Sequence, residues 1–239
     1  MPGIFLSAEW RNLAMLNYEV DPAILARRVP AGTELDLWQG RALVSLVGFM
    51  FLNTRVLGFP IPFHRNFAEV NLRFYIKRRD AGAERRAVAF VKELVPRWAI
   101  AFVARTFYNE NYIALPMRHS LETHTAGISA AYEWRANGRW QKLAVRCSGD
   151  PALPSKGSEA EFITEHYWGY AAQRRGSTVE YQVAHPQWRT WSADEFACDA
   201  DVKALYGEEF FPFLSKPPVS AFLAEGSAVT VSKGVRLTP

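Results

Sequence analysis

The amino-acid sequence predicts an α+β protein built mainly of antiparallel strands. Three observations support this: apolar and polar residues alternate over strand-length segments, several such segments are joined by short turn sequences, and the helical segments are short. Strands that occur in hairpins, rather than between long helices, argue against a doubly wound parallel sheet. The 239 residues suffice for a substantial core, and we expect one domain over residues 1–239.

The first predicted elements are a short helix and a long buried strand. Residues 21–30 favour a helix because Asp21 is a good N-cap and Pro22 fits the first helical position. The apolar run over residues 41–53 predicts a buried strand that bends at Gly48.

A hairpin follows. Residues 67–77 alternate strictly between apolar and polar side chains, and a turn at residues 80–82 leads to a second strand over residues 87–94. Residues 98–108 then change to a helical pattern.

Turn and cap signals define the next elements. Residues 126–134 and 139–147 predict a second hairpin around the Asn-Gly pair at residues 137–138. Ser158 and Glu161 have the spacing of a capping box, so we expect a helix to begin there.

The C-terminal part contributes further strands and one more predicted helix. Four strand candidates lie at residues 167–172, 178–185, 219–224 and 227–232. Ser192 and Glu195 repeat the capping-box spacing and predict a helical region that reaches Leu205.

Composition excludes several classes of protein. The hydrophobic fraction of 49% and the charged fraction of 22% are those of an ordinary globular chain. With only Cys147 and Cys198, neither a disulfide framework nor a cysteine-based zinc site is expected. The longest apolar stretch, residues 42–52, is too short to cross a bilayer, and no secretory signal is evident, so we expect a cytoplasmic protein without a membrane partner.

The net charge of +4 raises the question of nucleic-acid binding. The basic residues occur as isolated pairs beside turns, such as Arg78-Arg79, and no run of five like charges occurs. The charge pattern therefore does not favour nucleic acid as a partner, and this remains a third alternative.

Four polar residues of the segment 67–77 share one face of their strand because side chains alternate with period 2. They are Glu69, Asn71, Arg73 and Tyr75. If the intervening apolar residues face a core, this polar row lines a pocket; the alternative is a solvent-exposed face.

The order of segments resembles a known fold. The residues that carry the resemblance lie at 18–36, 69–75, 90–94, 108–117, 162–167 and 185–188. They are similar to the acetoacetate-decarboxylase-like superfamily, and within it to the YqjF-like family, a bacterial domain of unknown function. The resemblance spans about residues 5 to 232.

The resemblance implies a closed, cone-like or barrel-like antiparallel sheet around a central pocket, with short peripheral helices. Acetoacetate decarboxylases form a Schiff base on the first lysine of a Tyr-Pro-Lys-Lys motif, which requires an amine that is neutral near pH 7. The corresponding stretch here, residues 111–117, contains no lysine, and arginine cannot replace one. Decarboxylation through an imine is therefore not expected.

The glutamate of the decarboxylase Arg-Glu-Leu motif has a counterpart in Glu93, within Lys92-Glu93-Leu94. On a regular strand Lys92 and Glu93 point to opposite sides, and the resemblance favours Glu93 for the pocket. A carboxylate in an apolar cavity has a raised pKa and can act as acid or base. The alternative is a buried ion pair with an arginine.

Five further residues are candidates for the pocket or its chemistry. Arg105 could bind a carboxylate, Glu110 is a possible partner for it, and Tyr112 belongs to a loop expected at the pocket mouth. His185 and His166 could do acid–base chemistry, or could be hydrogen-bonded structural residues. No metal-ligand spacing and no phosphate-binding loop occurs, so neither metal nor cofactor is expected.

These observations favour a protein with a pocket for a small organic acid or carbonyl compound, without the Schiff-base lysine of acetoacetate decarboxylases. The first alternative is a lyase- or hydrolase-like enzyme that uses Glu93 as acid or base. A homo-oligomer remains open.

Overall fold

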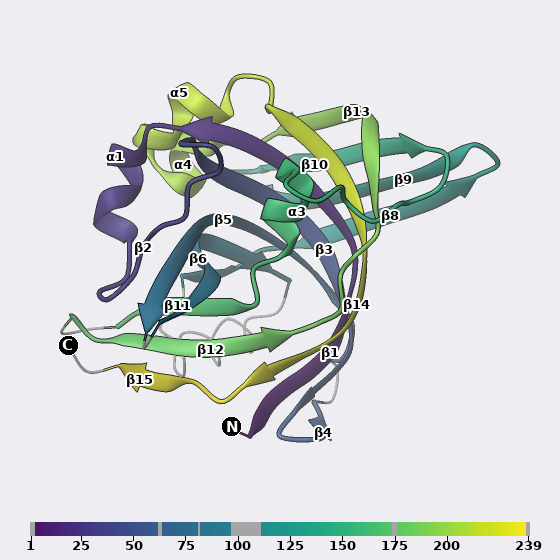
Figure 1. The fold of residues 1–239 in the computed structure, drawn as a ribbon. Helices are drawn as coiled ribbons and strands as arrows, with labels where there is room; N and C mark the ends of the chain where they lie inside the picture. The colour runs from purple at the N-terminus through teal and green to yellow at the C-terminus, as the bar shows by residue number, and fades with distance from the viewer. Residues whose placement is uncertain (1–2, 62–63, 81, 97–110, 174–175, 238–239) are drawn as a thin grey trace.

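The computed structural model describes residues 3–61, 64–80, 82–96, 111–173 and 176–237, and strands make up most of it (Figure 1). Its strands are β1 Ile4–Val20, β2 Glu34–Leu35, β3 Ala42–Val56, β4 Phe59–Pro60, β5 Phe67–Asp80, β6 Ala83–Val95, β7 Tyr112–Ala114, β8 Met117–His124, β9 Gly127–Ala136, β10 Arg139–Ser148, β11 Trp168–Ala172, β12 Thr178–Ala184, β13 Thr190–Asp199, β14 Ser220–Ser232 and β15 Val235–Leu237. Its helices are α1 Pro22–Leu25, η1 Ala26–Arg28, α3 Glu159–Thr164, α4 Val202–Tyr206, η3 Glu208–Phe210 and α5 Phe211–Leu214. The helix predicted over residues 98–108 lies outside the described residues.

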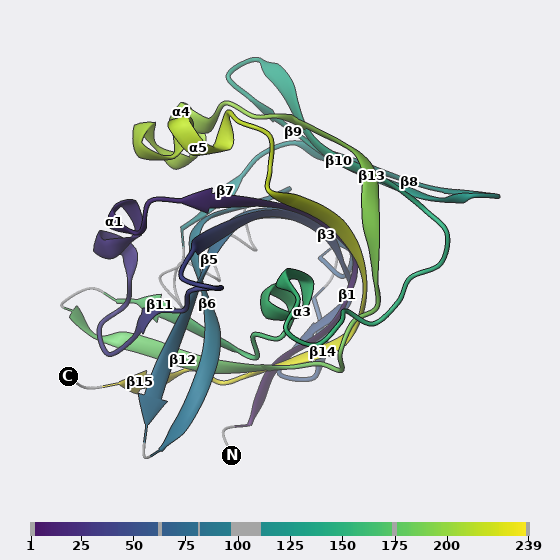
Figure 2. The ribbon, with the colours of Figure 1, turned by 45° about the horizontal axis from the view of Figure 1, so that its top comes forward.

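The long strands close on themselves. The antiparallel succession β6–β5–β3–β1–β14 is continued by β12, which pairs with β14, and by β11, which pairs with β12 and runs parallel to β6. The views in Figures 1 and 2 show the resulting ring, with α3 inside it. The predicted fold class, mainly antiparallel β with short helices, is confirmed.

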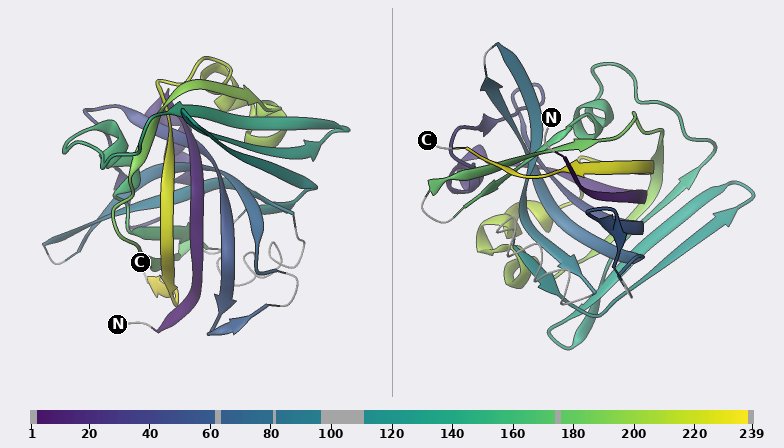
Figure 3. Two further views of the ribbon diagram at one scale, coloured as in Figure 1. Left: turned by 90° about the vertical axis from the view of Figure 1, so that its right-hand side faces the viewer. Right: turned by 90° about the horizontal axis from the view of Figure 1, so that it is seen from below.

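A second layer continues from the ring edge. Strands β13, β10, β9 and β8 follow β14 in the sheet and lie outside the ring (Figure 3). Tyr132, Trp134 and Leu143 from this layer pack with Val70 and the other apolar residues of β5 in one core cluster. Helices α4 and α5 contribute to the same cluster, so the main core lies between the ring and its outer cover.

Gly48 permits the close approach of these two layers. A Cβ atom at this position of β3 would lie 2.6 Å from Cδ2 of Tyr132. The Tyr132 hydroxyl donates a hydrogen bond to the Asn12 carbonyl oxygen at 2.7 Å, which fixes the ring of Tyr132 over β3. The glycine predicted as a bend is therefore a packing position.

Local signals predicted several element ends correctly, although the strands β1, β7 and β8 were not predicted. The Asp21 side chain accepts a hydrogen bond from the Ala23 amide at the start of α1, and Ser158 caps α3 by accepting from the Glu161 amide. Asn137 and Gly138 both have positive φ, at 51° and 78°, in the turn between β9 and β10.

The second predicted capping box is wrong. Ser192 and Glu195 lie within β13, which pairs with β10, and the helix begins only at Val202 after Asp201 caps it. A capping box satisfies two amide groups, whereas pairing with β10 satisfies a whole ladder, so tertiary context overrides the local signal. None of the helices in the described part of the chain is long and apolar enough to span a membrane.

The two strands predicted at the C-terminal end form one strand. Gly226, with φ of 76°, lies within β14 between the two predicted segments. A Cβ atom at this position would lie 2.0 Å from the Trp10 carbonyl oxygen of β1, so glycine lets β14 continue along β1.

We predict that Gly48→Ala destabilises the fold by about 1–3 kcal/mol, because the new methyl group forces Tyr132 out of its place. Urea unfolding followed by tryptophan fluorescence measures the change. Gly3→Ala is the control, since no heavy atom lies within 4 Å of a Cβ there. Equal stability of both variants would contradict the packing role of Gly48.

Candidate binding site

A cavity of about 200 Å³ is lined by side chains of the ring strands and by Ile163 and Thr164 of α3. One part of its wall is aromatic. Trp10 contacts Phe49 and Phe51 at ring-centroid distances of 5.6 and 5.7 Å, Phe51 stacks on Phe67 at 4.7 Å, and Trp188 completes the group. These five side chains, the aromatic wall, suit an apolar part of a ligand.

The adjoining part of the wall is polar and comes from β5, where Glu69 is the cross-strand partner of Phe49. Glu69, Asn71 and Arg73 line the cavity, with exposed fractions of only 2, 2 and 8%. The intervening residues, such as Leu72, face the outer core. The alternation that identified β5 thus directs three polar side chains inward, where they are buried.

Tyr75, the fourth member of the predicted polar row, does not line the cavity. Its hydroxyl lies 2.5 Å from the hydroxyl of Ser45, and its ring packs against Phe162 of α3 at 5.3 Å. α3 lies inside the ring and covers this part of β5, so the structure assigns Tyr75 to the packing around α3 rather than to the cavity wall.

A β-bulge brings Glu93 into the cavity. Lys92 pairs with Leu72 and Glu93 with Asn71, but Arg73 pairs with Phe90, so Val91 is an extra residue in β6. Cross-strand partners share a face, which places Glu93 inward beside Asn71 and Lys92 outward beside Leu72. Because of the bulge, Phe90 and Glu93 both line the cavity although they are three residues apart.

Two buried carboxyl groups occupy the polar wall. Glu69 accepts hydrogen bonds from the Asn71 amide at 2.9 Å and from the Tyr112 hydroxyl at 3.4 Å. Glu93, 1% exposed, is the strand neighbour of both Asn71 and Tyr112. Tyr112 lies on strand β7 rather than in the predicted loop, and it lines the cavity as well.

Arg73 brings a positive charge to the same wall. One of its terminal nitrogens, Nη2, lies 3.5 Å from the carbonyl oxygen of Ile163 and 3.8 Å from Sδ of Met15, both weak contacts. Among the described residues its Nε has no hydrogen-bond partner, and no carboxylate forms an ion pair with it. A buried guanidinium in this state favours an anionic ligand.

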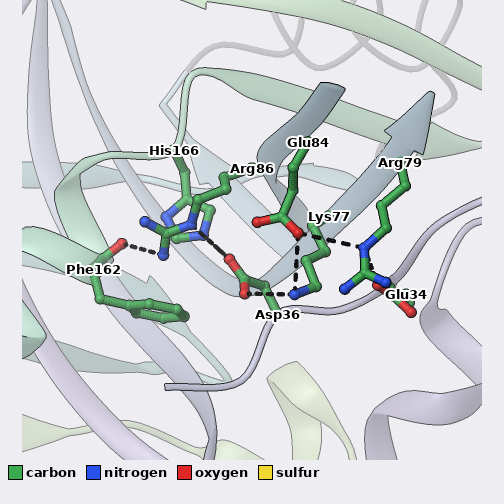
Figure 4. A network of polar contacts seen from close by, with 8 residues as sticks. All are labelled: Glu34, Asp36, Lys77, Arg79, Glu84, Arg86, Phe162 and His166. Carbon is green, nitrogen blue, oxygen red and sulfur yellow. Dashed lines mark hydrogen bonds and ion pairs between the residues drawn. The ribbon is translucent and has the colours of Figure 1, made fainter. Parts of the chain in front are cut away.

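His166 also lines the cavity; its sequence context left open whether it does acid–base chemistry or is a hydrogen-bonded structural residue. Its Nε2 lies 3.2 Å from Oδ2 of Asp36, which also accepts a hydrogen bond from Nε of Arg86 at 2.8 Å (Figure 4). Burial lowers the pKa of His166 to about 4 despite the nearby Asp36. Hydrogen bonds from His166 and Arg86 lower the pKa of Asp36 although burial opposes this, so Asp36 is ionised.

His185 contributes to the cavity wall from the end of β12. Its ring stacks on Trp188 at 4.1 Å and lies 4.7 Å from the ring of Tyr167, and its Nδ1 lies 2.9 Å from the Pro186 carbonyl oxygen. Burial lowers its pKa. The ring is held mainly by structural contacts.

Two predicted site residues, Arg105 and Glu110, lie outside the described residues. All seven lysines are described, and none lines the cavity. Lys92 faces the outer core, where burial and the nearby Arg28 lower its pKa. Within the described ranges, no three His, Cys, Asp or Glu side chains are grouped as metal ligands.

The ring, its outer layer and the central cavity define the acetoacetate-decarboxylase-like fold. Acetoacetate decarboxylase from Legionella pneumophila matches 99% of this chain and 88% of its own, with a TM-score of 0.67 at 11% identity. The enduracididine biosynthesis enzyme MppR, crystallised with HEPES, matches 100% of this chain and 89% of its own, with a TM-score of 0.68 at 13% identity. A further MppR structure is complexed with pyruvate.

Sequence comparison then assigns the family. The model of DUF2071, a family of uncharacterized conserved proteins, matches residues 7–228, and this chain belongs to that family. The uncharacterized protein YqjF of Bacillus subtilis (strain 168) is 28% identical over 196 residues, which cover 80% of this chain and 78% of YqjF. The predicted resemblance to YqjF is confirmed.

We predict that acid weakens the fold through His166. The pKa of His166 is about 4 in the folded protein, against an ordinary value of 6.5. Between these two pH values the imidazole is protonated in the unfolded chain but neutral in the folded chain, so acid favours unfolding. The free energy of unfolding should fall by about 3 kcal/mol between pH 6.5 and 4, since one pKa unit corresponds to about 1.4 kcal/mol.

Urea unfolding at a series of pH values measures this fall. His166→Gln should have a shallower pH dependence, whereas the same change at the exposed His124 should leave it as in the wild type. Identical slopes for the wild type and His166→Gln would exclude His166 as the titrating group.

Proposed function

We propose that the cavity binds a small carboxylic acid with an apolar substituent. Arg73 carries this proposal: it is a buried cation in a cavity, with no ion pair among the described residues. Guanidinium groups bind carboxylates through two parallel hydrogen bonds, and such bonds are stronger where water is excluded. The aromatic wall would hold the apolar substituent.

The neighbouring arginines of the same hairpin differ from Arg73 because each of them pairs with a carboxylate, and this difference supports a ligand carboxylate at Arg73. Arg78 and Arg85 both pair with Glu180, at 3.1 and 2.8 Å, and Arg86 pairs with Asp36. These three partly buried arginines, which do not line the cavity, are thus each matched by a carboxylate. Inside the cavity, a ligand carboxylate would do the same for Arg73.

The size of the cavity limits the ligand. Drug-sized ligands occupy pockets of roughly 300 Å³ or more, and this cavity has about 200 Å³. A small aromatic or branched acid is therefore a better candidate than a nucleotide or a long-chain lipid. The pyruvate bound to MppR, a protein of the same fold, is a small acid of the same chemical class.

We predict that phenylacetate binds and that Arg73→Gln weakens its binding about ten- to a hundredfold, because a buried charged hydrogen-bond pair contributes about 1.5–3 kcal/mol. Isothermal titration calorimetry measures the affinity. Arg146→Gln, an exposed arginine of β10, is the matched control and should bind as the wild type does. Neutral phenylacetamide that binds as tightly as phenylacetate would contradict a carboxylate site.

A second candidate function is acid–base catalysis by Glu93. The bulge at Val91 favours it, because bulges that redirect a side chain recur next to active sites. Glu93 would remove a proton from the carbon beside the carbonyl group of a bound acid, and Arg73 would stabilise the negative charge that develops. Since no lysine lines the cavity, this chemistry would proceed without an imine.

We predict that the protein exchanges the methyl protons of pyruvate for deuterium in D₂O, and that Glu93→Gln lowers this rate at least about a hundredfold. Proton NMR follows the exchange, with a protein-free sample as the control. Borohydride added with pyruvate should trap no adduct. An adduct on Lys92, or unchanged exchange in the variant, would contradict this second candidate.

A further inference from the structure

The protonation state of His166 follows from its partner. Asp36 is ionised and can only accept hydrogen bonds, so the His166 nitrogen facing it, Nε2, must carry a proton. Arg86 and Lys77 hold the Asp36 carboxylate on its other sides, at 2.8 and 3.8 Å (Figure 4). The Asp36 side chain therefore fixes one tautomer of the neutral imidazole.

The other ring nitrogen, Nδ1, is then a hydrogen-bond acceptor. It is buried, and in the described part of the chain no group donates to it. The ring is packed against Tyr75 at 4.7 Å and Phe162 at 5.0 Å between centroids. Buried acceptors without a donor cost free energy, so a ligand donor at this place would gain affinity.

His166 and Arg73 lie at the same part of the cavity. The guanidinium carbon of Arg73 is 5.8 Å from the centroid of the Tyr75 ring, against which His166 also packs, and Arg73 is close enough to lower the pKa of His166. An acid whose carboxylate contacts Arg73 thus carries its nearest carbon atoms past His166.

We infer that His166 Nδ1 accepts a hydrogen bond from a hydroxyl group of the bound acid, so that the cavity selects hydroxy acids over the corresponding keto and unsubstituted acids. This rests on the proposed carboxylate site. A keto oxygen can only accept, so it would face the Nδ1 lone pair without a hydrogen bond.

The charges around His166 keep this acceptor available near neutral pH. Arg73 and Arg86 disfavour protonation of the ring, and burial does so more strongly, whereas Asp36 favours it without reversing the balance. The ring is neutral above its pKa of about 4, so selection should hold at pH 7 and above.

Calorimetry at pH 7 with matched acids tests the inference. The first set is phenylacetate, phenylglyoxylate and each enantiomer of mandelate, which differ only at the carbon next to the carboxylate. The second set is 3-phenylpropanoate and each enantiomer of 3-hydroxy-3-phenylpropanoate. At least one hydroxy acid should bind about five times more tightly than its unsubstituted partner, the gain of one buried hydrogen bond.

Two variants separate His166 from its surroundings. His166→Gln can keep an amide donor toward Asp36 while it deletes the Nδ1 acceptor, and it should remove the preference for the hydroxy acid but retain binding of phenylacetate. His124→Gln, at an exposed position of β8, should keep the preference.

Nitrogen NMR of the histidine rings tests the inference on the wild-type protein, so it does not depend on whether a variant folds. In the wild type at pH 7, the His166 ring should show a protonated Nε2 and a bare Nδ1. Addition of the preferred hydroxy acid should shift the Nδ1 resonance toward its protonated value, whereas phenylacetate should not.

The outcomes distinguish the two proposals. Binding of phenylacetate that depends on Arg73, with no hydroxy acid binding more tightly, would overturn the role of His166 and leave the carboxylate site standing. A hydroxy-acid preference retained in His166→Gln would also overturn it. Failure of every acid to bind would overturn the carboxylate site and the inference with it.

Discussion

Both faces of β5 are enclosed by protein, and the rest of the molecule is arranged around that constraint. Residues 67–76 are buried without interruption, because the outer layer covers one face and the ring encloses the other. A polar side chain on the inner face therefore has little contact with bulk water to satisfy its hydrogen-bonding groups. It must bond to another protein group or to a molecule in the cavity, and the proposed carboxylate site rests on this requirement.

Charge inside the ring is distributed unevenly. The Asp36 carboxylate contacts the side chains of Arg86, Lys77 and His166, and through the last of these contacts it positions the imidazole ring. Glu69 is engaged with Asn71 and Tyr112. Arg73 has only a carbonyl oxygen and a sulfur atom as contacts in the described part of the chain, both at long distances. The cavity thus combines the Arg73 cation with buried neutral acceptors that have no donor among the described residues, Nδ1 of His166 and Oδ1 of Asn71, and two carboxyl groups lie nearby.

The fold shared with acetoacetate decarboxylase does not place a lysine in the cavity of this chain. Imine formation needs a lysine side chain in the cavity, and each lysine of this chain lies elsewhere. The bulge at Val91 instead directs Glu93 inward and Lys92 outward. A regular strand continued from the Arg73–Phe90 pair would have reversed the two side chains. A single extra residue therefore decides which of two adjacent ionisable groups the cavity contains.

The sequence was sufficient to predict the mainly antiparallel β fold class, the hairpins and the polar face of β5. Side-chain alternation and turn residues are local properties, so they can be recognised in the sequence. The sequence also placed Glu93 and Tyr112 among the candidates, through resemblance to a family rather than through any local pattern. The remaining features depend on contacts that exist only in the folded chain. Residues 192–199 form a strand because their backbone groups pair with those of β10. His166 became a candidate binding residue because Asp36, 130 residues away in sequence, fixes its tautomer. Contacts between distant segments leave no periodic signal in either segment, so no sequence pattern could have predicted them.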